Sequence, residues 1–450
     1  MMHDDGLTRV QYSELSDAVA QDDGARVRSI IKHLPPVNQA RLIESSTPPT
    51  RRLLWENIAD EAQPEVLTEL SEDIQSQFLE RMEASEVAAA TEGLETDDIV
   101  DILQQLPENV IQDVLQEMSW QDRHRVERVL SFDEDTAGGL MNTDTITVRP
   151  KFTLDVVLRY LRRHDDLPNT TDSLFVVNSG DEYVGTLPLS RVLTSDPSMT
   201  VREVMMTSIE PIIATATDRE VANLFERNDL VSAPVVDENG CLLGRITIDD
   251  VVDVIREDTD HNMMGLAGLD DDIDTFATVR KSLPRRALWL SINLLAAFTS
   301  SSVIKMFEAT IEQVVALAIL MPIVASMGGV AGNQTLTVVI RGMALGQISR
   351  SNLGWLLRRE LTMGLINGLF FAVSVGFMSY LWFGAWTLGL VIGLALIFNL
   401  LNAAIAGTVI PLVLKSMKID PALAGGMIQT TATDVLGFLS FLGLATIFYG

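Results

Sequence analysis

The apolar and polar positions of this chain divide it into a back part of long apolar runs and a front part of short periodic ones. Five apolar segments follow one another towards the C-terminus, at roughly 286–307, 311–340, 361–383, 386–414 and 422–449. Each reaches the ~20 residues that a helix needs to cross the hydrocarbon core of a bilayer. We therefore expect residues 284–450 to form a transmembrane domain of five helices.

Residues 1–132 contain an internal repeat with a period of 36 residues. Each copy has a leucine followed by a residue that suits the start of a helix, in the pairs Leu34-Pro35, Leu70-Ser71 and Leu106-Pro107. A helical bundle with chance spacing is the alternative. Three aligned copies favour stacked helical hairpins, which together form a small α-solenoid.

Residues 133–257 contain a second repeat, with a spacing of 59 residues. The stretch SLFVVNSGDEYVGTLPLSRVL (173–193) matches SAPVVDENGCLLGRITIDDVV (232–252), and each copy reads as strand, polar turn, strand and helix. The two copies resemble a tandem pair of CBS domains. That resemblance implies a regulatory, dimer-forming module rather than a catalyst.

Residues 258–283 join the second repeat to the first apolar run, and the charged stretch GLDDDIDTFATVRKSL (268–283) predicts a connecting helix there. The expected fold is therefore multidomain. It comprises an all-α helical-repeat N-terminal domain, an α/β tandem CBS pair, a connecting helix placed to pass movement to the membrane, and a five-helix α transmembrane domain.

Charge changes this picture by pointing to cations as partners. The first 283 residues hold 56 acidic and 24 basic residues, a net −32, whereas the remainder is near +4. Such an acidic front argues against nucleic acid. Cys241 is the only cysteine, which excludes a disulfide framework and fits a reducing compartment, and the acidic N-terminus lacks the pattern of a signal peptide.

Lysine and arginine alternate between the loops that join the apolar segments, and this bias predicts orientation. One set of loops contains Arg280, Lys281, Arg285, Arg286, Arg341, Arg350, Arg358, Arg359, Lys415 and Lys418. The other set contains only Lys305. We expect a multi-pass protein of the cytoplasmic membrane with its N-terminus in the cytoplasm and its C-terminus outside.

Asp434, in TTATDVLG (430–437), is the one ionisable residue deep in an apolar segment. A charged Asp facing lipid would cost about 2.5–3.5 kcal/mol on the insertion scale, so it must face protein or water. The alternative is a packing or helix-capping role. One carboxylate with backbone carbonyls, and no Cys or His in the spans, forms a hard oxygen environment suited to Mg²⁺ or Ca²⁺. A single Asp per chain also favours a symmetric homodimer around one pore.

The stretch PIVASMGGVAGNQ (322–334) places glycines and two carboxamides, Asn333 and Gln334, inside the second apolar run. Pro322 and the glycines favour a broken or thinned helix whose carbonyls turn to a cavity. Close packing of neighbouring helices is the other explanation of the glycines.

The whole domain order, together with PIVASMGGVAGNQTLTVVIRGMAL (322–345) and TTATDVLG (430–437), resembles the MgtE family of magnesium channels and transporters. The resemblance implies that Asp434 recognises hydrated Mg²⁺ with help from the carbonyls of Gly329 and Thr430. Gly426 stands where the family carries an Asn at the cytoplasmic start of the fifth span. This chain therefore departs from the family at a residue that the resemblance assigns to the gate.

The resemblance also implies a cytosolic Mg²⁺ sensor. Its ligands would be Asp97, Asp101, Gly139, Asp229, Asp250, Asp253 and Asp258, and a solvated acidic surface is the alternative for each acid. Arg219 and His261 stand where the resemblance leads us to expect further acids, and we expect the Arg219 charge to take the place of one Mg²⁺, giving weaker or fewer sensing sites. ATP binding to the CBS pair is doubtful, because LPLSR (187–191) lacks the acid that would hold a ribose and only Thr247 and Asp250 remain in the second copy.

The expected function is that of a dimeric Mg²⁺ channel regulated by Mg²⁺, and not that of an enzyme. The sequence has no Walker-type glycine loop and no His-Glu-x-x-His motif. The alternatives are a coupled carrier or a channel for another divalent cation such as Mn²⁺ or Co²⁺, and a membrane-anchored metal or nucleotide sensor that transports nothing.

Overall fold

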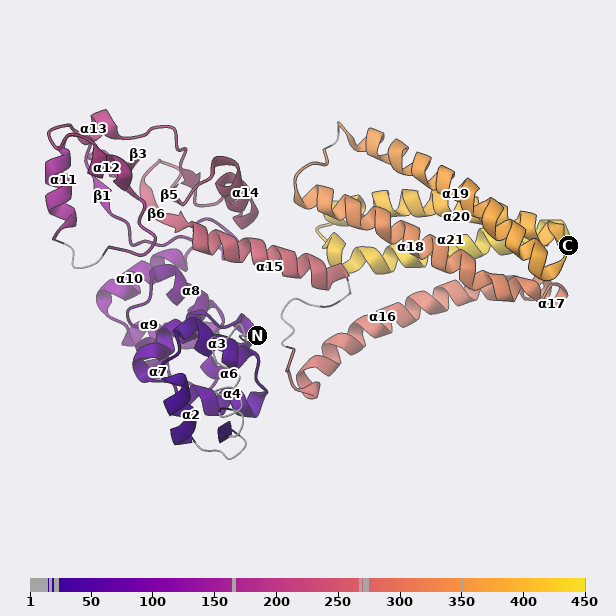
Figure 1. Cartoon of the computed structure of the whole chain (residues 1–450), viewed down its shortest axis with the longest axis horizontal. Coiled ribbons are helices and arrows are strands. Elements are labelled where there is room, and N and C mark those ends of the chain that lie inside the picture. Colours follow the sequence, from indigo (N-terminus) through magenta and orange to yellow (C-terminus); the bar gives the residue numbers. More distant parts are fainter. Residues whose placement is uncertain are drawn as a thin grey trace. The chain divides into compact units, whose positions relative to one another are not determined.

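The computed structural model describes residues 15, 18–19, 24–163, 167–266, 269, 275–349 and 351–449. These residues divide into two compact units (Figure 1). The first unit ends at Asp258 and also takes in residues 275–277. The second unit begins at Thr259 and includes the long C-terminal helices.

The first unit begins with a series of short helices, three of which start 36 residues apart. They are α2 (Gly24–Ile31), α3 (Pro36–Glu44), α4 (Pro48–Trp55), the 3-10 helix η1 (Asp60–Ala62), α5 (Gln63–Thr68), α6 (Glu72–Leu79), α7 (Ala84–Ala90), α8 (Thr96–Gln104), α9 (Glu108–Glu117) and α10 (Trp120–Val129). The expected helix starts are confirmed, because Pro35, Ser71 and Pro107 are the N-cap residues of α3, α6 and α9.

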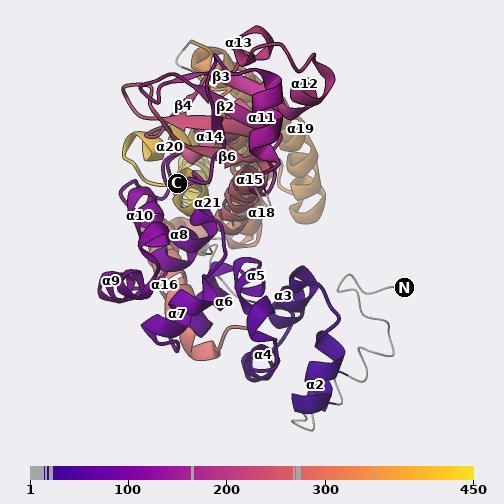
Figure 2. The same cartoon turned by 90° about the vertical axis from the view of Figure 1, so that its left-hand side faces the viewer.

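These helices pack in pairs around one apolar core. α3 lies against α4 and α5, α7 against α9, and α8 against α10 (Figure 2). The apolar positions that repeat along the sequence point inward, so Ile43, Leu79 and Leu115 are all buried. Burial of equivalent residues in successive helices is the packing expected of a solenoid.

Two small sheets of identical topology follow, as the second repeat predicts. The first contains β1 (Thr147–Val148), β2 (Ser173–Val177) and β3 (Tyr183–Pro188), with helices α11 (Leu154–Leu161), α12 (Leu189–Thr194) and α13 (Val201–Val204). The second contains β4 (Ile212–Ile213), β5 (Ser232–Val236) and β6 (Leu242–Thr247), with α14 (Asp218–Asn228) and α15 (Ile248–Leu266). In each sheet the central strand pairs in parallel with the first and antiparallel with the third.

The connecting segment expected at 258–283 is helical only in part. α15 continues from the second sheet past Asp258 to Leu266, residues 275–278 form a turn and coil, and α16 starts at Val279. Of the stretch 268–283, residues 268 and 270–274 lie outside the described part of the chain.

Five helices of the second unit are long and apolar enough to cross a membrane, as the hydrophobic pattern predicts. They are α16 (Val279–Met306), α18 (Ala316–Ala344), α19 (Leu353–Phe383), α20 (Trp386–Ser416) and α21 (Pro421–Tyr449), with the short α17 (Glu308–Gln313) before α18. α20 packs on α18, α19 and α21, and both α18 and α16 lie against α21 (Figure 1). α20 is therefore the central helix of this unit.

The structure corrects one expectation about the second span. α18 is continuous across Pro322 and the following glycines, so the expected break is wrong. A proline inside a helix removes one backbone donor and crowds the preceding turn, which can kink the helix without ending it. The glycines instead allow neighbouring helices to approach, since a Cβ on Gly407 of α20 would lie 2.7 Å from the carbonyl oxygen of Gly332. Close packing is the explanation that holds.

Candidate functional site

The membrane residues expected to contact the ion lie on the facing helices α18 and α21. A Cβ built on Gly329 would lie 4.0 Å from Cγ2 of Thr430, so these two positions are neighbours. Asn333 follows Gly329 by four residues and Asp434 follows Thr430 by four, which places each pair on one face of its helix. The structure thus brings Gly329 and Thr430 together and aligns Asn333 and Asp434 with them.

This face is not covered within a single chain. Asn333, Gln334 and Thr430 are exposed, and Asp434 is half-buried. Amides, a hydroxyl and a carboxylate cannot stay against hydrocarbon without partners. The face therefore requires water or another polar surface.

Three buried polar side chains behind this face were missed by sequence reasoning. Asn399 of α20 lies against Gly328 and Gly437, and Gln429 of α21 lies against Gly332. Glu360 of α19 is also buried, and it accepts hydrogen bonds from Thr335 Oγ1 and Arg359 Nη1 at 3.1 Å each. The glycine pattern of α18 was the available signal, because a glycine in a packed helix marks the place where a neighbour enters.

In the first unit, carboxylates of α8 and α15 are crowded together. Burial, followed by the charges of Asp250 and Asp98, raises the pKa of Asp97 well above its usual value. Asp97 is 7% exposed, and its Oδ1 has no hydrogen-bond partner among the described residues. An unpaired buried carboxylate oxygen is costly in a folded protein, so this position favours a proton or a cation.

The neighbours of Asp97 have raised pKa values for the same reasons. Burial and the nearby charges of Asp98 and Asp250 raise the pKa of Asp101 to about 8, although Asp101 remains open to solvent on one side. Burial and then Glu95 raise the pKa of Asp98 to about 6. Burial also raises the pKa of Asp250, which in addition accepts hydrogen bonds from the Thr247 backbone and hydroxyl.

A second group of acids extends this region, with Asp253 and Glu257 on α15 and Glu134 in the segment between α10 and β1. Burial, followed by Glu72 and Asp253, raises the pKa of Glu257 to about 7. Burial raises the pKa of Glu134 and of Asp253 as well. We call the eight residues Asp97, Asp98, Asp101, Glu134, Asp249, Asp250, Asp253 and Glu257 the acidic cluster.

Of the expected sensor residues, Asp97, Asp101, Asp250 and Asp253 belong to the acidic cluster, and the other three do not. Gly139 is buried, and a Cβ there would lie 2.6 Å from the Asp133 carbonyl oxygen. Asp229 is exposed at the end of α14 with φ 50°. Among the described residues, no three His, Cys, Asp or Glu side chains stand close enough together to hold a metal ion.

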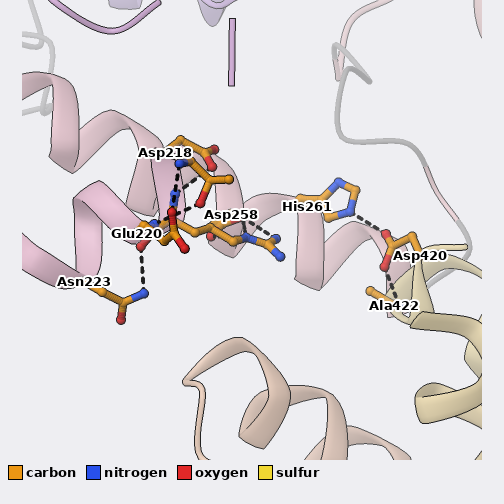
Figure 3. A network of polar contacts seen from close by, with 9 residues as sticks. Asp218, Glu220, Asn223, Asp258, His261, Asp420 and Ala422 are labelled. Atoms are coloured by element: carbon orange, nitrogen blue, oxygen red, sulfur yellow. Dashed lines mark hydrogen bonds and ion pairs between the residues drawn. The ribbon is translucent and has the colours of Figure 1, made fainter. Parts of the chain in front are cut away.

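Asp258 is engaged by a basic residue, as Figure 3 shows. Arg219 Nε donates to both carboxylate oxygens of Asp258 at 3.0 Å, and Arg219 Nη2 donates to Oδ1 at 2.6 Å. This bidentate pair ties α14 to α15. The guanidinium supplies a fixed positive charge at a position where the resemblance implies a metal ligand.

His261 lies three residues further along α15 and contacts the start of α21. Its Nε2 is 2.5 Å from Oδ2 of Asp420, and Oδ1 of the same carboxylate accepts a hydrogen bond from the Ala422 backbone at 2.8 Å (Figure 3). A Cβ on Gly265 would lie 3.1 Å from Ala422 Cβ, so the last turn of α15 lies against the first turn of α21.

Three family models match this chain. The model described as a divalent cation transporter, MgtE, matches residues 321–444, the MgtE intracellular N domain matches 34–135, and the CBS domain matches 137–197 and 201–257. Every expected ion-pathway residue lies within the first of these matches.

Curated relatives with the same description are similar over most of the chain. The magnesium transporter MgtE of Bacillus subtilis is 33% identical over 333 residues, which is 74% of this chain and 73% of that protein. The magnesium transporter MgtE of Thermus thermophilus is 32% identical over 325 residues, 72% of each chain. A crystal structure of the cytosolic domain of the Mg²⁺ channel MgtE with ATP is 29% identical, with a TM-score of 0.49, and covers 54% of this chain and 99% of that chain.

The acidic cluster predicts an inverse dependence of stability on pH in the absence of metal. A carboxyl whose pKa is raised by folding binds more protons in the folded than in the unfolded chain. Its contribution to stability is therefore complete below its usual pKa near 4 and is lost as the pH rises through about 6 to 8. We expect the thermal unfolding of the chelator-treated full-length protein, followed by tryptophan fluorescence, to shift to lower temperature between about pH 5 and pH 8.5.

Two additions sharpen this measurement. The variant Asp101→Asn removes the residue with the highest of the quoted pKa values and should flatten the pH dependence. Mg²⁺ should restore stability at high pH more than at low pH, because a ligating carboxylate must first lose its proton. A melting temperature that rises or stays constant with pH would contradict the raised pKa values.

Proposed function

Since this chain belongs to the MgtE family of magnesium transporters, we propose that it conducts Mg²⁺ through a pore between two copies and closes that pore when Mg²⁺ binds its acidic cluster. The observation that carries the proposal is the uncovered polar face of α18 and α21. It includes Gly329, Asn333, Gln334, Thr430 and Asp434.

A homodimer satisfies this face without placing it in lipid. Rotation about a two-fold axis would turn the same face of both copies towards one axis and bring two Asp434 carboxylates around it. Water along the axis would then solvate Asn333 and Gln334. A charged Asp434 left against lipid would instead cost about 2.5–3.5 kcal/mol on the insertion scale.

The chemistry of the face suits a hydrated divalent cation. Carboxylate, amide and backbone carbonyl oxygens are hard ligands, and Mg²⁺ gives up its water reluctantly. Asp434 would attract the hydrated ion by charge, and the carbonyls of Gly329 and Thr430 would accept hydrogen bonds from its water molecules. No covalent step is needed.

The acidic cluster supplies the regulation. Burial and the crowded negative charges raise the pKa values of Asp97, Asp98, Asp101 and Glu257, so these carboxyls retain protons at a higher pH than usual. Mg²⁺ usually keeps several of its waters and needs only one or two carboxylates, so it would displace protons from a pair of these acids and bridge α8 to the first part of α15. When Mg²⁺ leaves at neutral or higher pH, repulsion would loosen that contact, and α15 would transmit the change towards the membrane.

Arg219 would reduce the number of metal ions that this sensor requires. The Arg219 guanidinium already neutralises Asp258, so Asp258 would not bind regulatory Mg²⁺ while the pair is formed. In the proposed orientation, the acidic cluster, Arg219 and His261 all lie in the cytoplasm, as the basic loops favour.

The first test replaces the pore carboxylate. Asp434→Asn keeps the size of the side chain but removes its charge, so we expect uptake of Mg²⁺ to fall at least about tenfold, a loss equivalent to ~1.4 kcal/mol of ion stabilisation. Uptake is measured in cells that depend on this protein for Mg²⁺, together with expression and dimer content in detergent.

Glu312→Gln is the matched control, because Glu312 is an exposed acid of α17, away from the proposed pore residues. Normal uptake by Asp434→Asn would reject the pore. A non-transporting sensor would show no uptake above background in the unmodified protein, and a pore for another ion would prefer Mn²⁺ or Co²⁺ in competition.

The second test addresses the sensor. Millimolar Mg²⁺ should protect the region from about residue 85 to residue 260 of the full-length protein from protease, because bridged carboxylates hold the helices together. The double variant Asp97→Asn, Asp101→Asn should lose most of this protection. An identical digestion pattern with and without Mg²⁺ would contradict the regulatory role, even if transport were normal.

A further inference from the structure

Asn399 is a polar residue buried within the apolar helix α20. Its side chain is 1% exposed, and its Nδ2 donates a hydrogen bond of 2.8 Å to the carbonyl oxygen of Val324 on α18. α20 is the central helix of the second unit, and 61% of the residues in its most apolar stretch are buried. The amide is therefore isolated from lipid and bulk water.

The amide fits between two glycines of different helices. A Cβ built on Gly328 of α18 would lie 2.3 Å from Asn399 Nδ2, and one built on Gly437 of α21 would lie 2.8 Å from the same atom. Both distances are far below a van der Waals contact, so any larger residue at either position must move the amide or the helix. Asn399 thus contacts both helices at places where only glycine fits.

Each of these glycines is next to a residue of the proposed pore. Gly328 precedes Gly329 in the chain, and Gly437 follows Asp434 by three residues. A shift of either helix along α20 would therefore move the Gly329 carbonyl relative to the Asp434 carboxylate. Recognition of an ion through its water shell tolerates little displacement, because the acceptors must match the shell.

We propose that Asn399 is a positioning residue for ion recognition, whose amide sets the register of the two helices that carry Gly329, Thr430 and Asp434. The proposal rests on the proposed function for the link to ion recognition, whereas the register that the amide sets can be tested without it. The amide itself lies behind the pore face and contacts no ion.

Stability alone does not account for this residue. Asn399 Oδ1 is buried without a hydrogen-bond partner among the described residues. An interhelical hydrogen bond in a membrane contributes only about 0.6 kcal/mol on average, whereas an unpaired buried amide oxygen costs about 1–3 kcal/mol. An apolar residue of matching shape would stabilise the helices at least as well, but it would not fix one register by a directional bond.

A second amide supports the same arrangement one step along the interface. Gln429 of α21 is fully buried against Gly332 of α18 and precedes Thr430 in the chain. Its Nε2 also lacks a partner among the described residues. Gln429 and Gly332 therefore join α21 to α18 directly, and Asn399 of α20 lies between Gly328 and Gly437 of the same two helices.

The experiment uses a double-mutant cycle in the full-length protein. Gly328→Ala places a methyl group on the Asn399 amide, and Asn399→Ala removes the amide. Gly443→Ala is the control, because a Cβ on that glycine of α21 meets nothing within 4 Å. Initial rates of Mg²⁺ uptake are measured against Mg²⁺ concentration and against competing Mn²⁺, with dimer content and melting temperature recorded for each variant.

We expect Gly328→Ala and Asn399→Ala each to raise the half-saturating Mg²⁺ concentration about tenfold and to weaken the preference for Mg²⁺ over Mn²⁺. The double variant should be no worse than Asn399→Ala, because the methyl group then has nothing to displace. Gly443→Ala should match the unmodified protein. Two outcomes would overturn the proposal. One is that the fold-changes in half-saturating Mg²⁺ concentration of the two single variants multiply in the double variant. The other is a lower melting temperature with an unchanged half-saturating concentration and an unchanged preference for Mg²⁺ over Mn²⁺.

A second measurement reads the register without transport. In a Cys241→Ser background, cysteines at positions 329 and 430 are close enough to form a disulfide, since a Cβ at 329 lies 4.0 Å from Thr430 Cγ2. The yield of this disulfide should fall severalfold on adding either Gly328→Ala or Asn399→Ala, and adding both should lower it no further than Asn399→Ala alone. An unchanged yield would overturn the proposal whatever Asp434→Asn does, whereas normal uptake by Asp434→Asn with a changed yield would reject only the pore.

Discussion

A polar group at membrane depth must find a polar partner, and the membrane unit depends on how this chain meets that requirement. Behind the exposed polar positions of α18 and α21 the partners are internal. Asn399 bonds to the Val324 carbonyl, and Glu360 accepts from Thr335 and Arg359. On the face itself, Asn333, Gln334 and Thr430 stay exposed. The first set of polar residues joins helices within one chain, and the second set needs water or a polar surface outside that chain.

In the first unit, by contrast, carboxylates of like charge lie close together instead of being paired with opposite charges. Asp97, Asp101 and Asp250 come from helices that the solenoid and the second sheet bring together, and each has a raised pKa. The folding energy of the apolar core holds these charges close despite their repulsion. A ligand that removes the repulsion can therefore change the structure with a few contacts.

Much of the fold could be predicted from the sequence, because periodicity reports burial directly. The repeats of 36 and 59 residues and the five apolar runs correspond to the helices and sheets of the structure. Two features escaped for physical reasons. α19 begins at Leu353 and includes Arg358 and Arg359, since charges at the membrane surface do not end a helix. Asn399 lies in the stretch that was counted as uniformly apolar.

The candidate site was harder to predict from the sequence than the fold. The sequence indicated Asp434 and the glycines but could not show that Gly328 and Gly437 enclose one amide, because that contact joins three separate helices. It likewise named Asp97 and Asp101 as sensor residues without identifying Glu134 and Glu257 as neighbours. The position of Arg219 was noted, whereas its bidentate bond to Asp258 required the coordinates.

The carboxylate of Asp420 serves two different neighbours with its two oxygens. One oxygen caps the first turn of α21 through Ala422, and the other contacts His261. A substitution of Asp420 therefore removes the cap at the start of α21 and also breaks the link to His261. The resulting phenotype combines both losses. Replacement of the imidazole severs the link to Asp420 and leaves the bond from the Ala422 backbone in place, which makes position 261 the place where this link can be separated from the helix cap by mutation.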